Sequence, residues 1–250
     1  MSKQVLITGA NGRVGTALVE YIDNIERDYK LRLADLDIIE DRGIRIDVTD
    51  FSSCKTACDG IDTIIHLAGV ASADSPFEKV LPINIVGTYN IFQAASETGV
   101  KRVIYASSAQ AIEGYPLDVQ VRTDMPPRPK NLYGVSKAYG EALAAYYAYQ
   151  LDIEAVAIRI GAFQYQHEWD RLNSRDMSAW AEPEDICSLI VNSIDADLSG
   201  TPFIIAHGIS DNRFKRLDLS DTKKLFGYDP KSNAFTAWKV DFVRDSKPKR

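Results

Sequence analysis

Short apolar runs alternate with longer stretches of helical spacing through the first two thirds of the chain. The runs at residues 4–9 and 102–108 are apolar throughout rather than alternating with polar residues, which is typical of parallel strands covered on both faces. The same pattern predicts strands at 30–35, 44–47, 62–69 and 154–161, and helices at 14–22, 83–98 and 132–151. Strands and helices that alternate at this spacing predict an α/β fold with a doubly wound parallel sheet.

The pattern changes after residue 161. It predicts a helix at 183–194, a strand at 202–208 and a short helix at 219–227 that ends at a glycine. We interpret this remainder as a small C-terminal substrate cap over the ligand end of the sheet. The chain of 250 residues is thus predicted to be a single domain, with 1–160 as its core and 161–250 mostly as cap and tail. Doubly wound sheets bind ligands outside the C-terminal ends of their strands, so the loops there form the candidate site.

Composition narrows the class of protein. Hydrophobic residues make up 45% and charged residues 26%, with a net charge of -6, which opposes binding to nucleic acid or an anionic membrane. The first residues lack the apolar run of a signal peptide, and no stretch approaches the ~20 apolar residues of a membrane span. We therefore expect a cytoplasmic protein. The cysteines at 54, 58 and 187 have no histidine partners in the sequence that would complete a ligand set, so no metal is expected.

The segment TGANGRVG places Gly9, Gly12 and Gly15 directly after the first predicted strand, where a helix begins. Glycines there allow a tight turn against a pyrophosphate, which the helix N-terminus binds. Asp35 ends the second strand, and its carboxylate can accept hydrogen bonds from both ribose hydroxyls and repels a 2′-phosphate. This predicts an NAD-binding Rossmann core with a preference against NADP, although Arg13 beside the turn could contact a phosphate.

The segment IDVTD at residues 46–50 allows two interpretations. Asp47 and Val48 could contact the adenine of the dinucleotide. The segment could equally be the end of a strand followed by a helix cap at Thr49 or Asp50. Both interpretations remain open from the sequence.

Tyr133 and Lys137 lie one turn apart on a predicted helix, so both side chains leave the same face. A free tyrosine has a pKa near 10, and a nearby ammonium, together with the positive nicotinamide ring of bound NAD, would lower the pKa toward neutrality. Ser107 and Ser108 end the fifth strand at the same edge of the sheet and could orient a substrate hydroxyl. The combination predicts a tyrosine base with a lysine partner.

The motifs TGANGRVG, HLAG, YASS and YGVSK occur in this order and together resemble an extended short-chain dehydrogenase/reductase of the NAD-dependent epimerase/dehydratase branch. The resemblance implies catalytic Ser108, Tyr133 and Lys137, with Ser108 preferred over Ser107 by its spacing from the tyrosine. It also implies that NAD is contacted by Gly9, Asn11, Gly12, Arg13, Val14, Gly15, Asp35, Leu36, Asp47, Val48, Leu67, Ala68, Gly69, Asn84, Tyr133, Lys137 and Ile160.

Further stretches, among them LRLADLD and LFGYDPKSNA, are similar to short uronate dehydrogenases and archaeal NAD-dependent glucose-6-phosphate dehydrogenases. The resemblance implies oxidation of the C1 hydroxyl of a small sugar, either a hexuronate or a related aldose, to a lactone. Tyr133 would be the base and NAD the hydride acceptor. A sugar-phosphate dehydrogenase and a nucleotide-sugar epimerase or dehydratase with tightly bound NAD are the alternatives. A homo-oligomer through the helices at 83–98 and 132–151 is the family expectation.

The expected substrate contacts are Ser72, Ser108, Ala109, Gln110, Tyr133, Arg171 and Arg175. Either arginine could hold an anionic end of the sugar. Arg175 fits the spacing to Trp180, whereas an ungapped count from Tyr133 favours Arg171. The chain departs from the uronate enzymes in having Ala109-Gln110 in place of Asn-His and Ala162 in place of serine. These changes remove polar contacts to sugar without touching the predicted redox residues.

Overall fold

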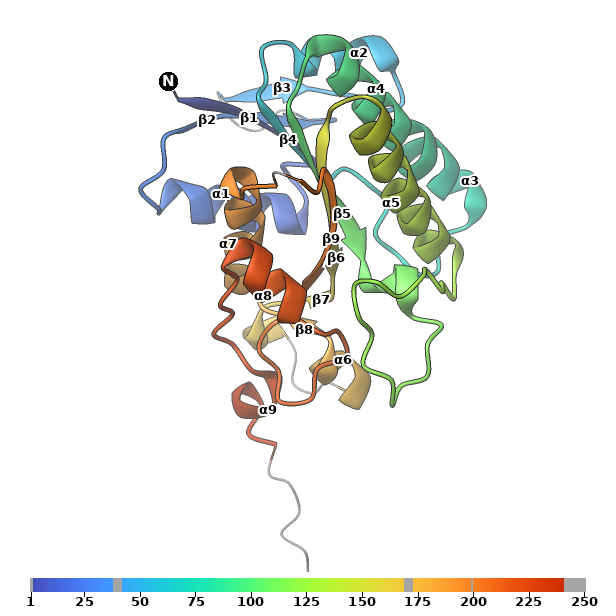
Figure 1. Ribbon diagram of the computed structural model, residues 1–250, viewed down its shortest axis with the longest axis vertical. Coiled ribbons are helices and arrows are strands. Elements are labelled where there is room, and N and C mark those ends of the chain that lie inside the picture. The colour runs from blue at the N-terminus through green and yellow to red at the C-terminus, as the bar shows by residue number, and fades with distance from the viewer. Residues whose placement is uncertain (1, 38–41, 169–172, 199, 241–250) are drawn as a thin grey trace, which may run out of the picture.

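The computed structural model describes residues 2–37, 42–168, 173–198 and 200–240. Its main sheet has 7 strands in the order β3-β2-β1-β4-β5-β6-β9, and every neighbouring pair is parallel. Strands are added on one side of β1 as far as β3 and then on its other side from β4 onward, so the strand order reverses between β1 and β4 (Figure 1). Such folds bind ligands at this switch point. The strands are β1 (Lys3–Thr8), β2 (Tyr29–Asp35), β3 (Gly43–Arg45), β4 (Thr63–His66), β5 (Arg102–Ser108), β6 (Glu154–Ile160) and β9 (Phe203–Gly208).

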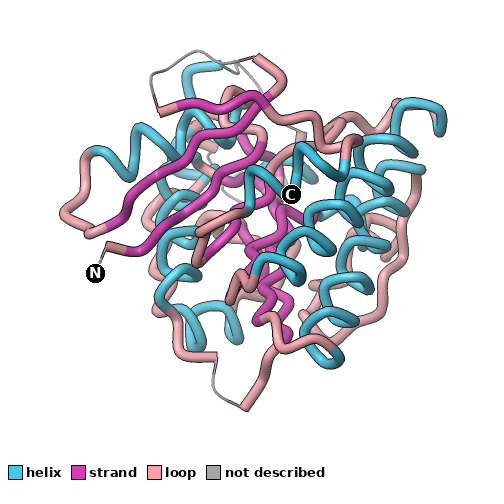
Figure 2. Tube along the Cα trace, turned by 90° about the horizontal axis from the view of Figure 1, so that it is seen from above, coloured by secondary structure: helices cyan, strands magenta, loops and turns pink. Residues whose placement is uncertain are grey.

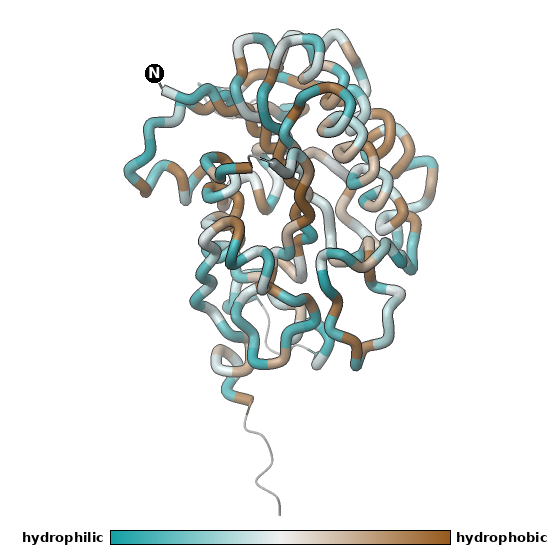
Figure 3. The backbone as a smooth tube through the Cα atoms, in the orientation of Figure 1, coloured by the Kyte–Doolittle hydropathy of each residue, from teal (hydrophilic) through white to brown (hydrophobic). Residues whose placement is uncertain are grey.

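Helices cover both faces of the sheet (Figure 2). Val5 and Ile7 of β1 belong to the core under α1 (Arg13–Asp23) and α7 (Pro183–Asp195). Leu6 between them belongs to the opposite core, under α2 (Phe51–Cys58), α4 (Thr88–Thr98) and α5 (Leu132–Gln150). The central strands are accordingly the most hydrophobic part of the trace (Figure 3). The doubly wound parallel sheet predicted from the uniformly apolar strands is confirmed.

The sheet extends further along the chain than expected. The sequence interpretation ended it at residue 160, but β9 pairs with β6 from Ala155↔Phe203 to Ile160↔Gly208. The helix α7 also packs against α1 rather than over the ligand end. The periodicity located this strand and this helix correctly, but an apolar strand carries no signal for which neighbour it pairs with. Much of 183–208 therefore belongs to the core layers.

The remaining C-terminal segments lie beyond the C-terminal ends of the strands (Figure 1). They are β7 (Ala162–Phe163), η3 (Gln166–Glu168), α6 (Ser174–Ser178), β8 (Trp180–Ala181), α8 (Ser220–Phe226) and α9 (Ala234–Ala237). β7 and β8 form a small two-stranded sheet of their own. This part of the chain is where the sequence placed the substrate cap.

The helix expected at 83–98 is divided into two. A short α3 (Phe77–Val80) leads into the π-helix η1 (Leu81–Gly87), and the α-helix proper begins at Thr88. Widened turns of this kind often occur at functional sites. Here the π-helix carries Asn84, whose amide bridges the loop after β4 and the helix α5: it pairs with the backbone N–H and C=O of Val70 and donates to Ser136 Oγ at 3.0 Å.

Candidate active site

The glycine turn after β1 brings backbone into close contact. Gly9 has φ of 73°, and a Cβ there would lie 2.6 Å from the backbone N of Ala68. A Cβ at Gly15 would lie 2.4 Å from the carbonyl O of Gly9. Only glycine fits either position. The turn therefore delivers the N-terminus of α1, with its free N–H groups, to the switch point of the sheet.

Asp35 stands at the end of β2 beside this turn. Its Oδ2 accepts a hydrogen bond from the N–H of Asn11 at 2.9 Å, and its Oδ1 accepts from the N–H of Leu36 at 2.8 Å. The two bonds fix the carboxylate while leaving lone pairs on both oxygens. It lines a hollow of about 640 Å³ together with nine other residues expected to contact NAD. These are Gly9, Asn11, Gly12, Leu36, Asp47, Val48, Leu67, Ala68 and Gly69.

The segment after β3 combines features of both sequence interpretations. Asp50, and not Thr49, caps α2 by accepting from the N–H of Ser52. Asp47 accepts from both the hydroxyl and the N–H of Thr49, and these hydrogen bonds hold the pKa of Asp47 below its usual value. Both Asp47 and Val48 still line the hollow beside Asp35.

A second hollow of about 360 Å³ adjoins the first, and Leu67 and Gly69 line both. Ser108 reaches it from the end of β5, and Tyr133 and Lys137 reach it from the first turns of α5. Asn131 caps that helix by accepting from the N–H of Gly134 at 2.7 Å. The three residues expected to be catalytic thus converge on one cavity next to the nucleotide hollow.

The ionisation of Tyr133 depends on two opposing influences of the polypeptide. Burial raises the pKa of Tyr133, and a side-chain hydrogen bond with Ser108 opposes this only in part. Burial also lowers the pKa of Lys137 to about 8, and its Nζ donates to the carbonyl of Ala106 at 2.7 Å and lies 5.6 Å from the Tyr133 ring centroid. The polypeptide alone therefore does not lower the tyrosine pKa, because desolvation outweighs the hydrogen bond from Ser108.

The two serines that end β5 have different partners. Ser107 Oγ donates to Glu141 Oε1 of α5 at 2.6 Å. The same carboxylate takes a bidentate pair from Arg159 of β6, with both distances 2.8 Å. Ser108 Oγ accepts from the N–H of Gln110, which leaves its hydrogen free for Tyr133. Sequence reasoning missed Glu141 and Arg159. The available signal was an arginine inside an otherwise apolar strand, EAVAIRI.

The remaining predicted site residues fall into three groups. Arg13, Val14, Ala109, Gln110, Ile160 and Arg175 line the second hollow. Gly15, Asn84 and Ser72 line neither hollow in the described chain: Gly15 and Asn84 are buried packing and bridging residues, and Ser72 is exposed between the lining residues Ala71 and Ala73. Arg171 lies outside the described residues.

Two arginines at the second hollow are already paired with carboxylates. Arg175 donates from Nε and Nη2 to the two oxygens of Glu113 at 3.0 and 2.5 Å, and from Nη1 to Asp176 at 2.7 Å. Burial lowers the pKa of Arg175, but the two carboxylates raise it by more. Arg13 donates to Glu168 at 2.5 Å. Glu113, directly after the 3-10 helix η2 (Ala109–Ile112), was not recognised from the sequence.

In the described part of the chain, no group of three or more His, Cys, Asp or Glu side chains could hold a metal ion. The three cysteines are buried, and burial raises the pKa of each thiol to about 12. Among the helices described, none is long and apolar enough to cross a membrane.

Comparison with known proteins agrees with this geometry. The model of the NAD dependent epimerase/dehydratase family matches residues 5–180. The NAD-dependent glucose-6-phosphate dehydrogenase of Haloferax volcanii is 36% identical, over 94% of this chain and 95% of that protein. A uronate dehydrogenase of Pseudomonas putida is 35% identical, over 93% and 85%. The crystal structure of the uronate dehydrogenase from Agrobacterium tumefaciens is 33% identical with a TM-score of 0.84, over 99% and 93%. The chain belongs to the NAD-dependent epimerase/dehydratase family, and its cofactor is NAD.

Proposed function

We propose that this protein is a dehydrogenase that oxidises the C1 hydroxyl of a small sugar, a hexuronate or a related aldose, to the lactone with NAD. The observation that carries the proposal is the convergence of Ser108, Tyr133 and Lys137 on a cavity that adjoins the Asp35 hollow. The similarity to sugar dehydrogenases over more than nine tenths of the chain supports the same reaction class.

The residues present fit NAD in both hollows. The Gly9–Gly15 turn and the α1 N-terminus would hold the pyrophosphate. The turn can form because its glycines lack a Cβ, which at Gly9 or Gly15 would occupy the space of neighbouring backbone. Asp35 would accept hydrogen bonds from the hydroxyls of the adenosine ribose, with Asp47 and Val48 beside the adenine. When bound, NAD supplies the hydride acceptor and a positive ring near Tyr133.

The chain's own residues then handle the proton. Ser108 donates to the substrate C1 oxygen and to Tyr133 and so aligns the two groups. Tyr133 removes the hydroxyl proton as a general base. Lys137 would hold the nicotinamide ribose and, as an ammonium below its pKa of about 8, would favour the phenolate. Because burial raises the Tyr133 pKa, oxidation should become faster as the pH rises from neutrality.

A substrate panel tests the proposal. Uronates, aldoses and sugar phosphates are incubated with NAD or NADP, and formation of the reduced cofactor is followed by absorbance. Reduction of NAD by at least one small sugar is expected. A sugar-phosphate dehydrogenase, favoured by the 36% identity to the Haloferax volcanii enzyme, would respond to the phosphates alone. No net reduction, with NAD retained through purification, would instead indicate a nucleotide-sugar epimerase or dehydratase.

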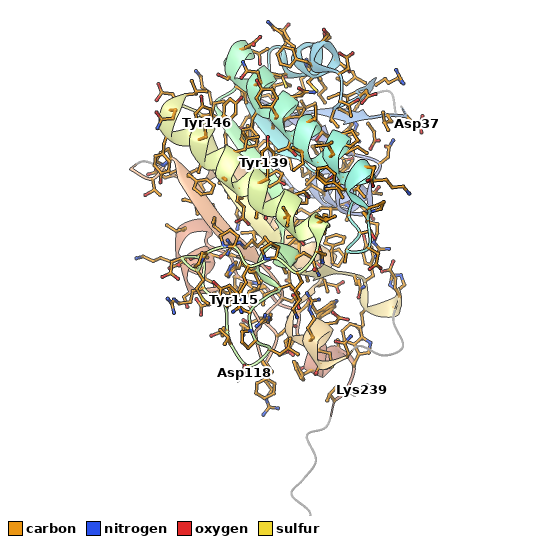
Figure 4. All side chains as sticks on the ribbon, turned by 90° about the vertical axis from the view of Figure 1, so that its right-hand side faces the viewer. Asp37, Tyr115, Asp118, Tyr139, Tyr146 and Lys239 are labelled. Carbon is orange, nitrogen blue, oxygen red and sulfur yellow. The ribbon has the colours of Figure 1, made fainter. Side chains whose placement is uncertain are left out.

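Tyr133→Phe should reduce kcat by at least about 100-fold while NAD binding, measured by fluorescence titration, stays within error. Tyr139→Phe is the matched control, because Tyr139 sits on the outer side of the same helix (Figure 4). Retention of more than a few per cent of activity by the Tyr133 variant would overturn the assignment of the base. A cytoplasmic location and a homo-oligomeric state stay predictions within this proposal.

A further inference from the structure

The arginine expected to bind an anionic sugar is occupied by the protein itself. Arg175 lines the second hollow with a side chain 21% exposed, and it lies between Glu113 and Asp176, whose side chains are 10% and 20% exposed. We call these three residues the Arg175 cluster. One guanidinium and two carboxylates give the cluster a formal charge of -1. The buried Arg216 interacts electrostatically with both Glu113 and Arg175 and brings the local sum to zero, so no net positive charge attracts an added anion.

The other cations lining the hollow do not change this balance. Arg13 forms its own ion pair with Glu168. Lys137 donates to the carbonyl of Ala106 and stands beside Tyr133, where it serves the reacting end. Among the described residues that line this hollow, every cation thus has a carboxylate or carbonyl partner.

Arg175 still offers hydrogen-bond donors to the hollow. A guanidinium has five N–H groups. Three of those on Arg175 are used by Glu113 and Asp176, one each from Nε, Nη1 and Nη2, so one remains on each terminal nitrogen. Glu113 and Asp176 are not among the described residues that line the hollow, so they act on it through their charge. A sugar hydroxyl can accept from the two remaining N–H groups, whereas an ionised carboxylate or phosphate would also meet the field of two nearby like charges.

We infer that Glu113 makes this site select sugars whose end facing Arg175 carries hydroxyl groups rather than a carboxylate or phosphate. The inference rests on the proposed function and names its substrate class, neutral aldoses. Glu113 acts through Arg175 and is a positioning residue: it turns an anion-binding arginine into a donor for hydroxyls. Its place five residues after Ser108 lets one short segment set both chemistry and selectivity.

The first experiment compares sugars that differ only at C6. Glucose, glucuronate and glucose 6-phosphate are measured with the wild-type protein and NAD, as are galactose and galacturonate. The pentoses xylose and arabinose extend the neutral series. The kcat/KM for the best neutral hexose should exceed that of its own anionic forms by roughly tenfold or more, because like charges at short range disfavour the anion.

The second experiment removes the charge of Glu113. Glu113→Gln should shift the ratio of kcat/KM for uronate to that for its parent aldose by about tenfold toward the uronate, mainly through KM. Adding Arg175→Gln to this variant should abolish the shift, because the freed cation is then lost. Asp118→Asn is the control with the same change in net charge. Asp118 is exposed in the loop that follows Glu113 (Figure 4).

The outcomes separate the two proposals. If no sugar of either class reduces NAD, the proposed function fails. If sugars are oxidised but wild type prefers a uronate or a phosphate to its neutral parent, the inference about Glu113 is wrong while the function stands. An unchanged ratio in Glu113→Gln, or an equal shift in Asp118→Asn, contradicts it as well. Circular dichroism checks folding, and Glu113→Ala replaces a variant that does not fold. If neither variant folds, the wild-type ratios decide.

Discussion

Two arginine–glutamate pairs of this protein share a bidentate geometry but have opposite surroundings. Arg159 and Glu141 join β6 to α5, and their side chains are 0% and 3% exposed. Arg175 and Glu113 join the cap to the segment after β5, beside a cavity, and Arg175 keeps 21% exposure. The first pair holds the helix that presents Tyr133 and Lys137. In the second pair, Arg175 lines the hollow where substrate would bind.

The difference lies in what each carboxylate is free to do. Glu141 is shared between Arg159 and Ser107, so its charge is compensated inside the protein. Breaking such a pair leaves a desolvated charge and costs far more than the pair contributes in net stability. When Glu113 is removed, the guanidinium of Arg175 still has its ion pair with Asp176 and still lines the cavity. Loss of the buried pair should therefore appear in stability, and loss of the cavity pair in selectivity.

The largest expected effect follows from breaking the buried pair. Glu141→Gln leaves the Arg159 guanidinium without a counter-charge, and we expect the free energy of unfolding to fall by about 3–5 kcal/mol. Urea denaturation followed by circular dichroism measures this. Glu113→Gln is the direct comparison and should cost clearly less. The double variant Arg159→Met/Glu141→Leu should recover much of the loss, because no unpaired charge remains. Equal losses for Glu141→Gln and Glu113→Gln would remove the distinction drawn between the two pairs.

Adjacent serines sharpen the same comparison at smaller scale. Ser107→Ala removes a hydrogen bond to the buried Glu141 and should cost roughly 1.5–3 kcal/mol of stability, with kcat reduced little. Ser108→Ala should lower kcat by about 100-fold and leave stability nearly unchanged, because Ser108 faces Tyr133 and the cavity. Steady-state kinetics and urea denaturation of both variants test this. A kinetic loss confined to Ser107→Ala would reverse the assignment of the catalytic serine.

The sequence was sufficient to predict site residues where a motif lies at the end of a predicted strand or at the start of a predicted helix. Gly9, Asp35, Ser108, Tyr133 and Lys137 all follow from a predicted strand or helix and its register, because parallel strands end at one edge. Their convergence on two adjoining hollows is what the pattern implied.

Features that depend on long-range packing were not predictable in this way. The pairing of β9 with β6, the raised pKa of Tyr133 and the pairing of Arg175 with Glu113 each need partners far apart in sequence. Residue type indicated that Arg175 is a cation. It carried no information about which carboxylate would reach it.

The smallest expected effect is the loss of folding stability in mild acid, which we assign to the buried histidines His66 and His207. Burial lowers the pKa of His66 to about 3 and the pKa of His207 to about 4. For His207, the charge of Arg159, its neighbour in the β6–β9 register, also lowers the pKa, whereas the hydrogen bond with the Asp218 carbonyl raises it. The unfolded chain binds protons near pH 6.5 and the folded chain does not, so stability is lost as the pH falls below 6.5 toward these values. Each histidine should contribute up to about 1.4 kcal/mol per pH unit.

The measurement is urea denaturation between pH 7 and pH 5, a window above the ordinary titration of carboxylates. Burial raises the pKa of Glu182 to about 7, so this carboxyl also gains a proton in the window, but it does so in every variant compared. We expect His207→Gln to flatten the loss of stability across that window, because the buried neutral ring at β9 is then replaced by a group that does not titrate. His167→Gln is the matched control, since His167 is exposed in the cap. If His167→Gln flattened the profile and His207→Gln did not, proton binding would belong to the cap, and the buried region would no longer be the one whose charges set stability.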